Sequence, residues 1–404
     1  MLHRFSKTDC CKENKDFSIR NVNVWLTEKC CFRCIYCYEK PYEYKPKVLD
    51  EKLIPVIIDW LLHMSKNGTV SISLFGGEPL LEWELIKKFN EFRLKLMRVR
   101  NRRINLGIVS NIYLLDDEKL DYLVRNDIGI LVSIDGCQKT MAIHRGIGDY
   151  ENRMKMGEIV IENAKKILSK FDKRKITARM TWTYHNLPFL LNDFKFLYSL
   201  GFTNIFHAYP DDNFRNLTED ELKQYELIML QDTKRWFKEI KNIPLSQISQ
   251  KMNRFHYTSP CGAGKGFAGI DTEGNVFPCH RFIFWKKWQI GNVYTTQTNL
   301  EKRKLFFNYN NKIISEKCRT CRHQGCGGQC FASSYEKYKD IYAIDDFQCK
   351  INDIHWRLIY DLRNDEEFCK MFKIKKPLMT DPNIKPKVYD LDKLVKFSLQ
   401  EQKK

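Results

Sequence analysis

The chain has 404 residues, of which 43% are hydrophobic and 29% charged, so it can bury a substantial core as one large domain or two ordinary ones. It has no run of about 18 apolar residues, and residues 1–20 lack the apolar core of a signal peptide. These features exclude a membrane-spanning protein and predict a cytoplasmic location.

The chain has 15 cysteines and a formal net charge of +18. In a cytoplasmic protein, so many cysteines favour metal ligation over a disulfide framework. The positive charge could attract nucleic acid, anionic lipid or an acidic peptide, or it could belong to a solvated lysine-rich surface.

Residues 21–210 alternate short apolar runs with amphipathic stretches. The predicted strands cover residues 21–27, 70–75, 104–110, 129–135, 175–183 and 203–209, and five helices lie between them. Repeated strand–helix units predict an α/β fold with a parallel sheet curled into a partial (β/α)6 TIM-like barrel. A sixth helix is predicted at 218–241, with Asn216 or Thr218 as its N-cap.

The pattern changes after residue 245, where glycine and cysteine become more frequent and helical periodicity falls. Residues 261–279 predict a hairpin that turns at 271–275. A cysteine-rich block follows at 318–349, and the lysine-rich end predicts an extended arm with a short helix, or partial disorder. The predicted divisions are 1–20, 21–245, 246–375 and 376–404.

The first cysteine motif lies directly after the first strand and consists of Cys30, Cys34 and Cys37. Three thiolates can hold three irons of a 4Fe–4S cube and leave the fourth iron without a protein ligand, whereas a ferredoxin loop supplies a fourth cysteine. A zinc knuckle takes four ligands in pairs. Cys31 interrupts the spacing and is expected to point away, and Tyr36 is expected to pack beside the cluster.

A C-x3-C-x-aromatic-C loop after the first strand of such a repeat resembles the radical S-adenosylmethionine enzymes. The resemblance implies that the amino and carboxylate groups of S-adenosylmethionine chelate the open iron. An electron from the cluster then cleaves the sulfonium and produces a 5′-deoxyadenosyl radical. The alternative is a zinc site or an incidental group of thiols.

Polar residues at the predicted strand ends extend this resemblance. In the family, a segment like Gly76, Gly77 and Glu78 binds the amino group of the methionine moiety of S-adenosylmethionine. Without the cysteine loop before it, the same segment would be interpreted as a turn. Asn111 and Ser133 end the third and fourth strands, where barrel sites lie, and are candidate cofactor contacts. On the fifth strand, a further candidate, Arg179, could meet the cofactor carboxylate or form a salt bridge.

The second group of cysteines resembles the SPASM extension, which carries two auxiliary 4Fe–4S clusters in enzymes that modify peptides and proteins. Its central spacing is C-x2-C-x4-C-x3-C, one residue shorter than the family pattern. The resemblance implies a distal cluster on Cys318, Cys321, Cys326 and Cys349 and a nearer cluster on Cys261, Cys279 and Cys330. A zinc ribbon is the alternative.

The nearer cluster has an unassigned fourth ligand. Phe255 stands where some relatives have another cysteine, so this cluster could keep an open iron or take His256.

His280 follows Cys279 at the position where sulfatase-maturating relatives have an aspartate, which counts against formylglycine formation. The stretch from Phe277 to Phe282 instead resembles maturases of ribosomally made peptides. His280 could accept a proton during radical oxidation, or it could be a structural histidine. Among the other cysteines, Cys137 follows the fourth strand and is a candidate for catalysis.

Together these features predict a radical S-adenosylmethionine enzyme with three 4Fe–4S clusters that oxidatively modifies a ribosomally made peptide, by a cross-link such as a thioether or carbon–carbon bond. Expected partners are a peptide or protein substrate, an electron donor such as flavodoxin or ferredoxin, and a separate leader-recognition protein, because only 29 residues precede the cluster loop. The alternatives are a maturase of a folded protein, an enzyme acting on a small molecule or RNA, and an electron-transfer scaffold.

Overall fold

A computed structural model describes residues 17–39, 45–210, 214–252, 259–323 and 325–372. It divides into two compact units, each described by itself below. The first comprises Met1–Arg215, Pro244–Ser246 and Gly262–Phe307, and the second comprises Asn216–Ile243, Gln247–Cys261 and Asn308–Lys404. This division differs from the predicted boundary near residue 245, and the predicted tail at 376–404 lies outside the described residues.

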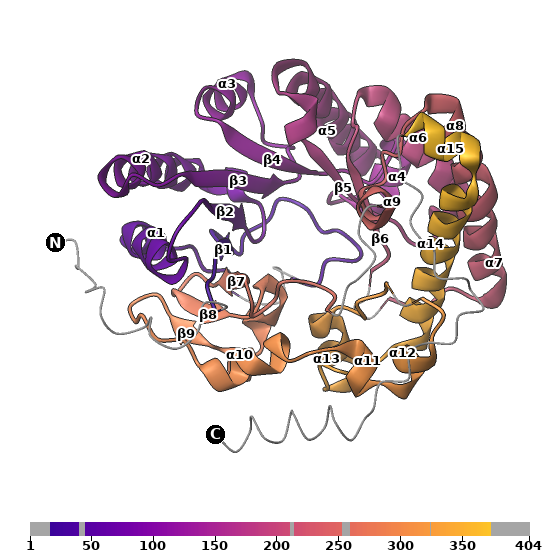
Figure 1. The fold of residues 1–404 in the computed structure, drawn as a ribbon. Coiled ribbons are helices and arrows are strands. Elements are labelled where there is room, and N and C mark those ends of the chain that lie inside the picture. Colours follow the sequence, from indigo (N-terminus) through magenta and orange to yellow (C-terminus); the bar gives the residue numbers. More distant parts are fainter. Residues whose placement is uncertain (1–16, 40–44, 211–213, 253–258, 324, 373–404) are drawn as a thin grey trace. The chain divides into compact units, whose positions relative to one another are not determined.

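The first unit is built on one sheet, whose strands within the described residues follow the order β6-β5-β4-β3-β2-β1-β7-β8-β9 (Figure 1). The bounds are β1 (Asn21–Trp25), β2 (Val70–Phe75), β3 (Ile104–Ser110), β4 (Ile128–Ser133), β5 (Thr177–Thr181), β6 (Ile205–Ala208), β7 (Phe267–Ile270), β8 (Asn275–Phe277) and β9 (Gly291–Asn292). Strands β1 to β6 pair in parallel. The six predicted strands and the partial barrel are therefore confirmed.

Helices cover the outer face of this curved sheet (Figure 1). They are α1 (Leu53–Met64), α2 (Trp83–Arg100), α3 (Asp117–Arg125), α5 (Tyr150–Lys170) and α6 (Leu190–Leu200), and a short helix, α4 (Gln138–His144), precedes α5 in the chain. Sequence signals fix their ends: Asp116 and Asp149 accept hydrogen bonds from the first turns of α3 and α5, and Gly201 ends α6 with a φ of 114°. The short helix α4 was not predicted.

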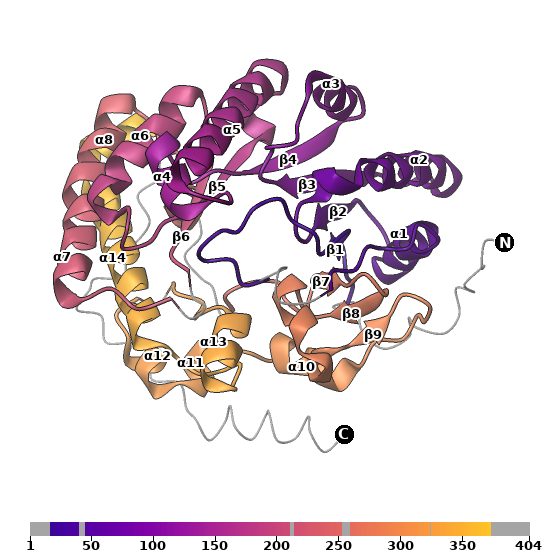
Figure 2. The same cartoon turned by 180° about the vertical axis from the view of Figure 1, so that it is seen from behind.

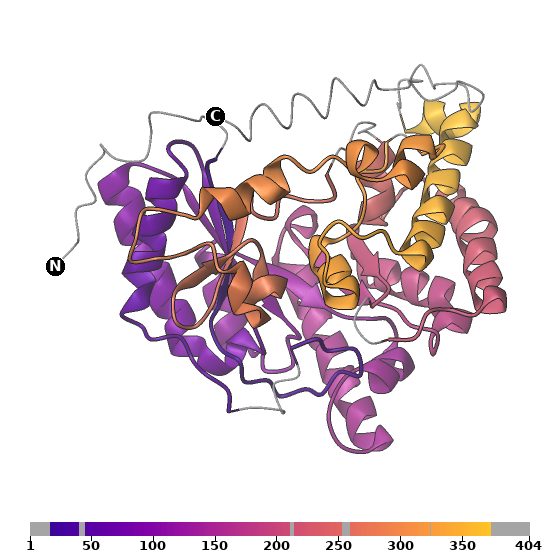
Figure 3. The same ribbon diagram turned by 90° about the horizontal axis from the view of Figure 1, so that it is seen from below.

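A hairpin extends the sheet beyond β1 (Figure 3). Strands β7 and β8 are antiparallel, and Asp271 Oδ1 accepts from the backbone N–H groups of Glu273 and Asn275 in the turn. This confirms the predicted hairpin. Strand β7 also pairs in parallel with β1, in the register Asn21 to Phe267, which the sequence did not predict.

Helix α10 (Leu300–Phe307) supports the hairpin through Arg303, whose side chain is fully buried. Its guanidinium donates to the carbonyls of Gly264, Lys265 and Phe17 and to the hydroxyl of Thr298, at 2.8–3.0 Å. One cation therefore satisfies four acceptors from segments far apart in the sequence.

The second unit is largely helical. The predicted helix at 218–241 is present as a continuous stretch of α7 (Glu219–Leu227), a π-helical segment (Ile228–Thr233) and α8 (Lys234–Ile240). Thr218 and Glu221 form a capping box at its start. The other helices are α9 (Ser246–Met252), α11 (Asn311–Ile314), α12 (Glu316–Thr320), α13 (Phe331–Tyr338), α14 (Asp346–Asn364) and α15 (Glu366–Met371). No described helix is long and apolar enough to cross a membrane.

Replacing Arg303 by Met should lower the free energy of unfolding by about 3 kcal/mol, because it leaves buried carbonyls without donors. Urea titration followed by circular dichroism measures this loss. The matched control is Lys304→Met, which removes only an exposed pair with Glu301 and should change stability by less than about 0.5 kcal/mol. Equal losses in the two variants would contradict the assigned role of Arg303.

Candidate functional site

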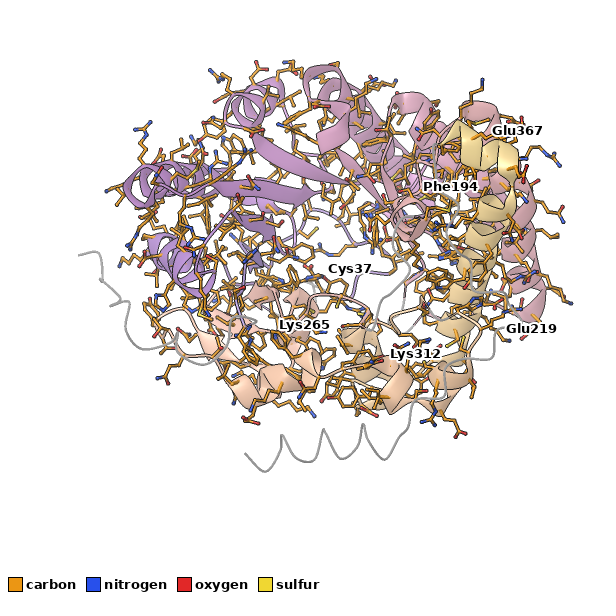
Figure 4. All side chains as sticks on the ribbon, in the orientation of Figure 1. Cys37, Phe194, Glu219, Lys265, Lys312 and Glu367 are labelled. Atoms are coloured by element: carbon orange, nitrogen blue, oxygen red, sulfur yellow. The ribbon has the colours of Figure 1, made fainter. Side chains whose placement is uncertain are left out.

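The three-cysteine loop leaves β1 and runs inside the curve of the sheet, where Cys37 lies (Figures 2 and 4). Its backbone is fixed by the end of α4 and the residues that follow: Ile35 N–H donates to the His144 carbonyl at 3.0 Å, and Arg33 N–H donates to the Gly146 carbonyl at 2.8 Å. A turn closes between Cys34 and Cys37, whose N–H donates to the Cys34 carbonyl. The loop is therefore held at a defined place in the barrel.

The thiols of this loop influence one another. Burial raises the pKa of Cys34 to about 12, and Cys37 and Cys31 add to the rise, while Arg145 opposes it. The pKa of Cys30 is also raised, first by its hydrogen bond with Cys31 and then by burial and Cys34. Thiolates this close repel one another in a buried site, and cationic irons would remove the repulsion. The loop thus fits an iron–sulfur cluster.

Cys31 does not point away from the other cysteines, contrary to the prediction. Its thiol contacts that of Cys30, and its Sγ accepts a hydrogen bond from Asn111 Nδ2 at 3.5 Å. Among the described residues, no three His, Cys, Asp or Glu side chains form a group suited to a single metal ion.

The segment after β2 is pressed against the start of this loop. A Cβ on Gly77 would lie 1.9 Å from the Lys29 carbonyl oxygen, and a Cβ on Gly76 would lie 2.4 Å from that of Thr27. Glu78 N–H donates to the same Lys29 carbonyl at 2.7 Å. Only glycine allows this approach, so these two residues shape the cluster loop as well as the predicted cofactor site.

The Glu78 carboxylate is buried and joins the ends of β2 and β3. It accepts from Leu80 N–H and Ser110 Oγ on Oε1, at 3.0 and 2.7 Å, and from Asn111 N–H on Oε2, at 2.8 Å. Burial raises its pKa, and these donors oppose the rise. Since Oε2 accepts only this one bond among those found, it keeps a lone pair that could face an ammonium group.

The predicted cofactor residues Ser133 and Arg179 lie side by side on β4 and β5. The Arg179 guanidinium stacks 4.6 Å from the Phe206 ring, and its buried Nη1 has no hydrogen-bond partner among the described residues. Burial lowers its pKa. A buried guanidinium nitrogen of this kind needs an acceptor, and a carboxylate suits it best. The predicted role of Arg179 as a contact of the cofactor carboxylate stays a prediction.

Asp135 and Arg145, which the sequence analysis missed, lie beside the cysteines. Arg145 donates from Nε and Nη2 to the two oxygens of Asp135, at 2.8 and 3.0 Å, and its Nη1 lies 4.0 Å from Cys34 Sγ. The predicted residue Tyr36 donates to Asp135 Oδ2 at 2.5 Å. An aspartate at the carboxyl end of β4 followed by an arginine after α4 was the available sequence signal.

His280 follows Cys279 in a short helical turn after β8. Asn23 Nδ2 donates to its Nδ1 at 3.0 Å, and its ring packs 4.6 Å from that of Phe75. Burial, with the charges of Arg281 and Arg179, lowers its pKa to about 3. This geometry favours a neutral imidazole that carries its proton on Nε2, which is a hydrogen-bond donor and not a proton acceptor.

Cys137 caps α4, and its contacts are structural. Its N–H donates to Asp193 Oδ1 at 3.0 Å, and its thiol lies 3.8 Å from Thr140 Oγ1. Asp193 belongs to α6, one of the helices on the outer face of the sheet. These contacts give no support to the predicted catalytic role.

The predicted distal cysteines surround common neighbours in the second unit. The pKa of Tyr309 is raised first by burial and then by Cys318, Cys326 and Cys349. The pKa of Tyr360 is raised by burial and then by Cys321, with a smaller contribution from Cys326. Each of the four distal cysteines therefore acts on at least one of these two tyrosines, and Cys326 acts on both.

A lysine and a glutamine bind two of these distal cysteines, one through its backbone carbonyl and one through its sulfur. The buried Lys312, visible in Figure 4, donates to the carbonyls of Cys318 and His323 at 3.1 and 3.2 Å. Gln329 Nε2 donates to Cys349 Sγ at 3.2 Å. Such donors suit a negatively charged cluster.

The nearer auxiliary cluster stays a prediction. Cys279 belongs to the first unit, and Cys261 and Cys330 belong to the second. Phe255 and His256 lie outside the described residues.

Gly77→Ala should displace the cluster loop, because the new Cβ would overlap the Lys29 carbonyl. We expect the variant to lose most of the iron bound by this loop, measured as iron and sulfide content after anaerobic reconstitution. Gly129→Ala is the control, since its Cβ would lie 4.0 Å from the Leu106 carbonyl oxygen. Wild-type iron content in Gly77→Ala would show that the close approach is not needed.

Comparisons with known proteins find radical S-adenosylmethionine enzymes. Residues 25–191 match the Radical SAM superfamily. The chain is 24% identical over 368 residues to the radical SAM cyclopropyl synthase TigE of Paramaledivibacter caminithermalis, covering 82% of this chain and 72% of that protein. It is also 24% identical over 366 residues to the serine-type anaerobic sulfatase-maturating enzyme of Bacteroides thetaiotaomicron, covering 80% and 84%.

Solved structures share the fold. The native anSMEcpe structure with bound AdoMet and Cp18Cys peptide aligns with a TM-score of 0.69 at 16% identity, over 88% of this chain and 99% of that one. Streptococcus suis SuiB bound to its precursor peptide SuiA aligns with a TM-score of 0.56 at 14% identity, over 82% and 76%. Over residues 25–191 the chain therefore belongs to the radical S-adenosylmethionine superfamily, and its fold, including the cysteine-rich C-terminal part, is shared with the anSMEcpe and SuiB structures.

Proposed function

We propose that this enzyme oxidatively modifies a ribosomally made peptide, forming a cross-link such as a thioether or a carbon–carbon bond. The observation that carries the proposal is the pairing of two sites in one chain. One is the three-cysteine loop, whose Tyr36 acts on the buried Arg179, and the other is the four-cysteine set, in which Lys312 binds the Cys318 carbonyl and Gln329 binds the Cys349 sulfur. An electron-transfer scaffold would not need an anion-binding arginine beside its cluster.

At the first site, separate residues would bind the cluster and the two charged groups of the cofactor. Cys30, Cys34 and Cys37 would hold the cluster, which with bound S-adenosylmethionine supplies hydrogen-atom abstraction. Arg179 would bind the cofactor carboxylate. The free lone pair of Glu78 Oε2 and the carbonyls of the glycine segment would orient its ammonium.

The surroundings of His280 suit a peptide side chain. The rings of Tyr38 and Phe75 lie within 6.5 Å of its ring centroid, and Phe284, which packs on Tyr38, is 41% exposed. An aromatic wall with a neutral imidazole donor would hold an apolar residue beside a backbone carbonyl. Both anSMEcpe and SuiB have been solved with peptides bound, which supports a peptide substrate for this fold.

A maturase of a folded protein, such as a sulfatase or a quinoprotein subunit, is the second candidate. The similarity to the sulfatase-maturating enzyme favours it. His280 counts against the sulfatase reaction, because its Nδ1 already accepts from Asn23. A small molecule or RNA as substrate has no observation in its favour beyond the net charge of +18.

The proposed partners follow from the chemistry. Delivery of single electrons needs a donor of the flavodoxin or ferredoxin type, and the positive charge of the chain suits an acidic donor or an acidic peptide. A separate leader-recognition protein would present the peptide.

The first test is the iron count. Anaerobic reconstitution should give about twelve irons per chain, for three cubane clusters. Cys34→Ala and Cys318→Ala should each remove about four. Cys369→Ser is the control, because that buried thiol on α15 contacts only the Arg363 and Leu362 carbonyls among its identified partners. A metal content of about four irons and one zinc per chain would contradict the three-cluster proposal.

The reaction itself is tested with short peptides encoded beside the gene. The reduced enzyme should release 5′-deoxyadenosine and convert the cognate peptide to a product lacking two hydrogen atoms, detected by mass spectrometry. A variant with Cys30, Cys34 and Cys37 all replaced by Ala should do neither. Formylglycine on a sulfatase peptide, without any cross-linked product, would favour the second candidate.

The role of His280 is tested by nuclear magnetic resonance of the iron-loaded enzyme with labelled histidine. Because Asn23 donates to Nδ1, we expect a neutral ring protonated on Nε2. His280→Gln identifies the signal, and Asn23→Ala should alter the tautomer. A ring protonated on Nδ1 in the wild type, with Nε2 free, would restore His280 as the proton acceptor.

A further inference from the structure

The buried ion pair of Arg145 and Asp135 touches the cluster loop directly. Both side chains are nearly inaccessible, at 8% and 0% exposure. Arg145 uses Nε and Nη2 for the carboxylate and leaves Nη1 4.0 Å from Cys34 Sγ. One guanidinium therefore spans a carboxylate and a predicted iron ligand.

The carboxylate of Asp135 is fixed from several sides. Tyr36 donates from the cluster loop, at 2.5 Å, and Thr181 N–H donates from the end of β5, at 2.9 Å. His144 Nδ1 lies 3.4 Å from Oδ2. Although burial raises the pKa of Asp135, the charge of Arg145 and the contact with His144 hold it well below its ordinary value. The pair is thus locked in its ionised form.

Stability alone does not explain such a pair. Removing two charges from water is costly, and apolar residues of the same volume often stabilise a protein as well or better. This pair contacts Cys34 and Tyr36 of the cluster loop, and the guanidinium packs 5.4 Å from the Tyr36 ring centroid. Its placement points to an effect on the loop and on what the loop holds.

We propose that Arg145 is a positioning residue for the cluster held by Cys34. It orients the Cys34 sulfur, and its positive charge stabilises the reduced cluster, while Asp135 and Tyr36 hold the guanidinium in place and partly offset its charge. This rests on the proposed cluster at Cys30, Cys34 and Cys37. The reduction potential then depends on the balance between two fixed charges, since reduction adds one negative charge beside them.

Substitutions of Arg145 and Asp135 are expected to shift the reduction potential of the cluster in opposite directions. Arg145→Met leaves the Asp135 carboxylate beside the cluster and should lower its reduction potential. Asp135→Asn leaves the guanidinium uncompensated and should raise it. Arg145→Lys keeps the charge and should lie closer to the wild type than Arg145→Met does. A purely structural pair has no reason to give shifts of opposite sign.

The experiment is a potentiometric titration of the full, reconstituted enzyme followed by electron paramagnetic resonance. The loop cluster is identified by the change of its signal when S-adenosylmethionine is added. The control is Arg93→Met, which removes a buried arginine of α2 that donates to the Asn126 carbonyl. Its potential should equal that of the wild type.

Shifts of the same sign in Arg145→Met and Asp135→Asn, or no shift in either, would overturn the proposal. If Arg145→Met binds no iron in the loop, the other two variants test the proposal. Asp135→Asn must raise the reduction potential of the cluster. Tyr36→Phe must lower this potential, because Asp135 loses a hydrogen-bond donor. A wild-type enzyme without loop iron would instead refute the proposed function.

Discussion

The site depends on one close approach between backbones. At the end of β2, Gly77 lies so near the Lys29 carbonyl that a side chain would overlap it, and Glu78 N–H binds the same carbonyl. This contact fixes the chain where it enters the cysteine loop. The middle of the loop is fixed by Arg33 and Ile35, whose N–H groups bind Gly146 and His144 at the end of α4. The sulfurs therefore have a defined place before any metal binds.

The charges around the cysteine loop matter as well as its backbone contacts. Thiols crowded in a buried loop resist ionisation, so the loop is costly unless cations occupy it. Fixed positive groups lie nearby: Arg145 lies against Cys34, and Arg179 has a buried nitrogen that finds no partner in the part of the chain that the structure describes. The second unit repeats the principle with Lys312 and its distal cysteines. In both regions, buried donors lie close to cysteines.

Much of this could be read from the sequence, because the signals are local. Strand and helix periodicity located the six strands, the hairpin turn followed from the stretch around Gly274, and Thr218 was among the expected caps. The cysteine spacing gave the family. These features depend on residues close together in the chain, where propensity and hydrogen bonding act directly.

The rest depends on contacts that local patterns do not encode. Strands β7 and β1 are far apart in the sequence, and the pairing that joins them uses only backbone groups. The side to which Cys31 turns follows from the path of the loop, and the position of Arg145 follows from the short helix α4, which was not predicted. The tautomer of His280 depends on Asn23, distant in sequence, so its role could not be judged from residue type alone.

The central claim is that a radical formed at the three-cysteine loop removes a hydrogen atom from a peptide. Its most direct test is a cognate peptide deuterated at the modified residue, incubated with reduced enzyme and unlabelled S-adenosylmethionine. The account predicts that deuterium appears in 5′-deoxyadenosine in proportion to modified peptide. Modified peptide accompanied by 5′-deoxyadenosine without deuterium, with every candidate carbon labelled in turn, would contradict it.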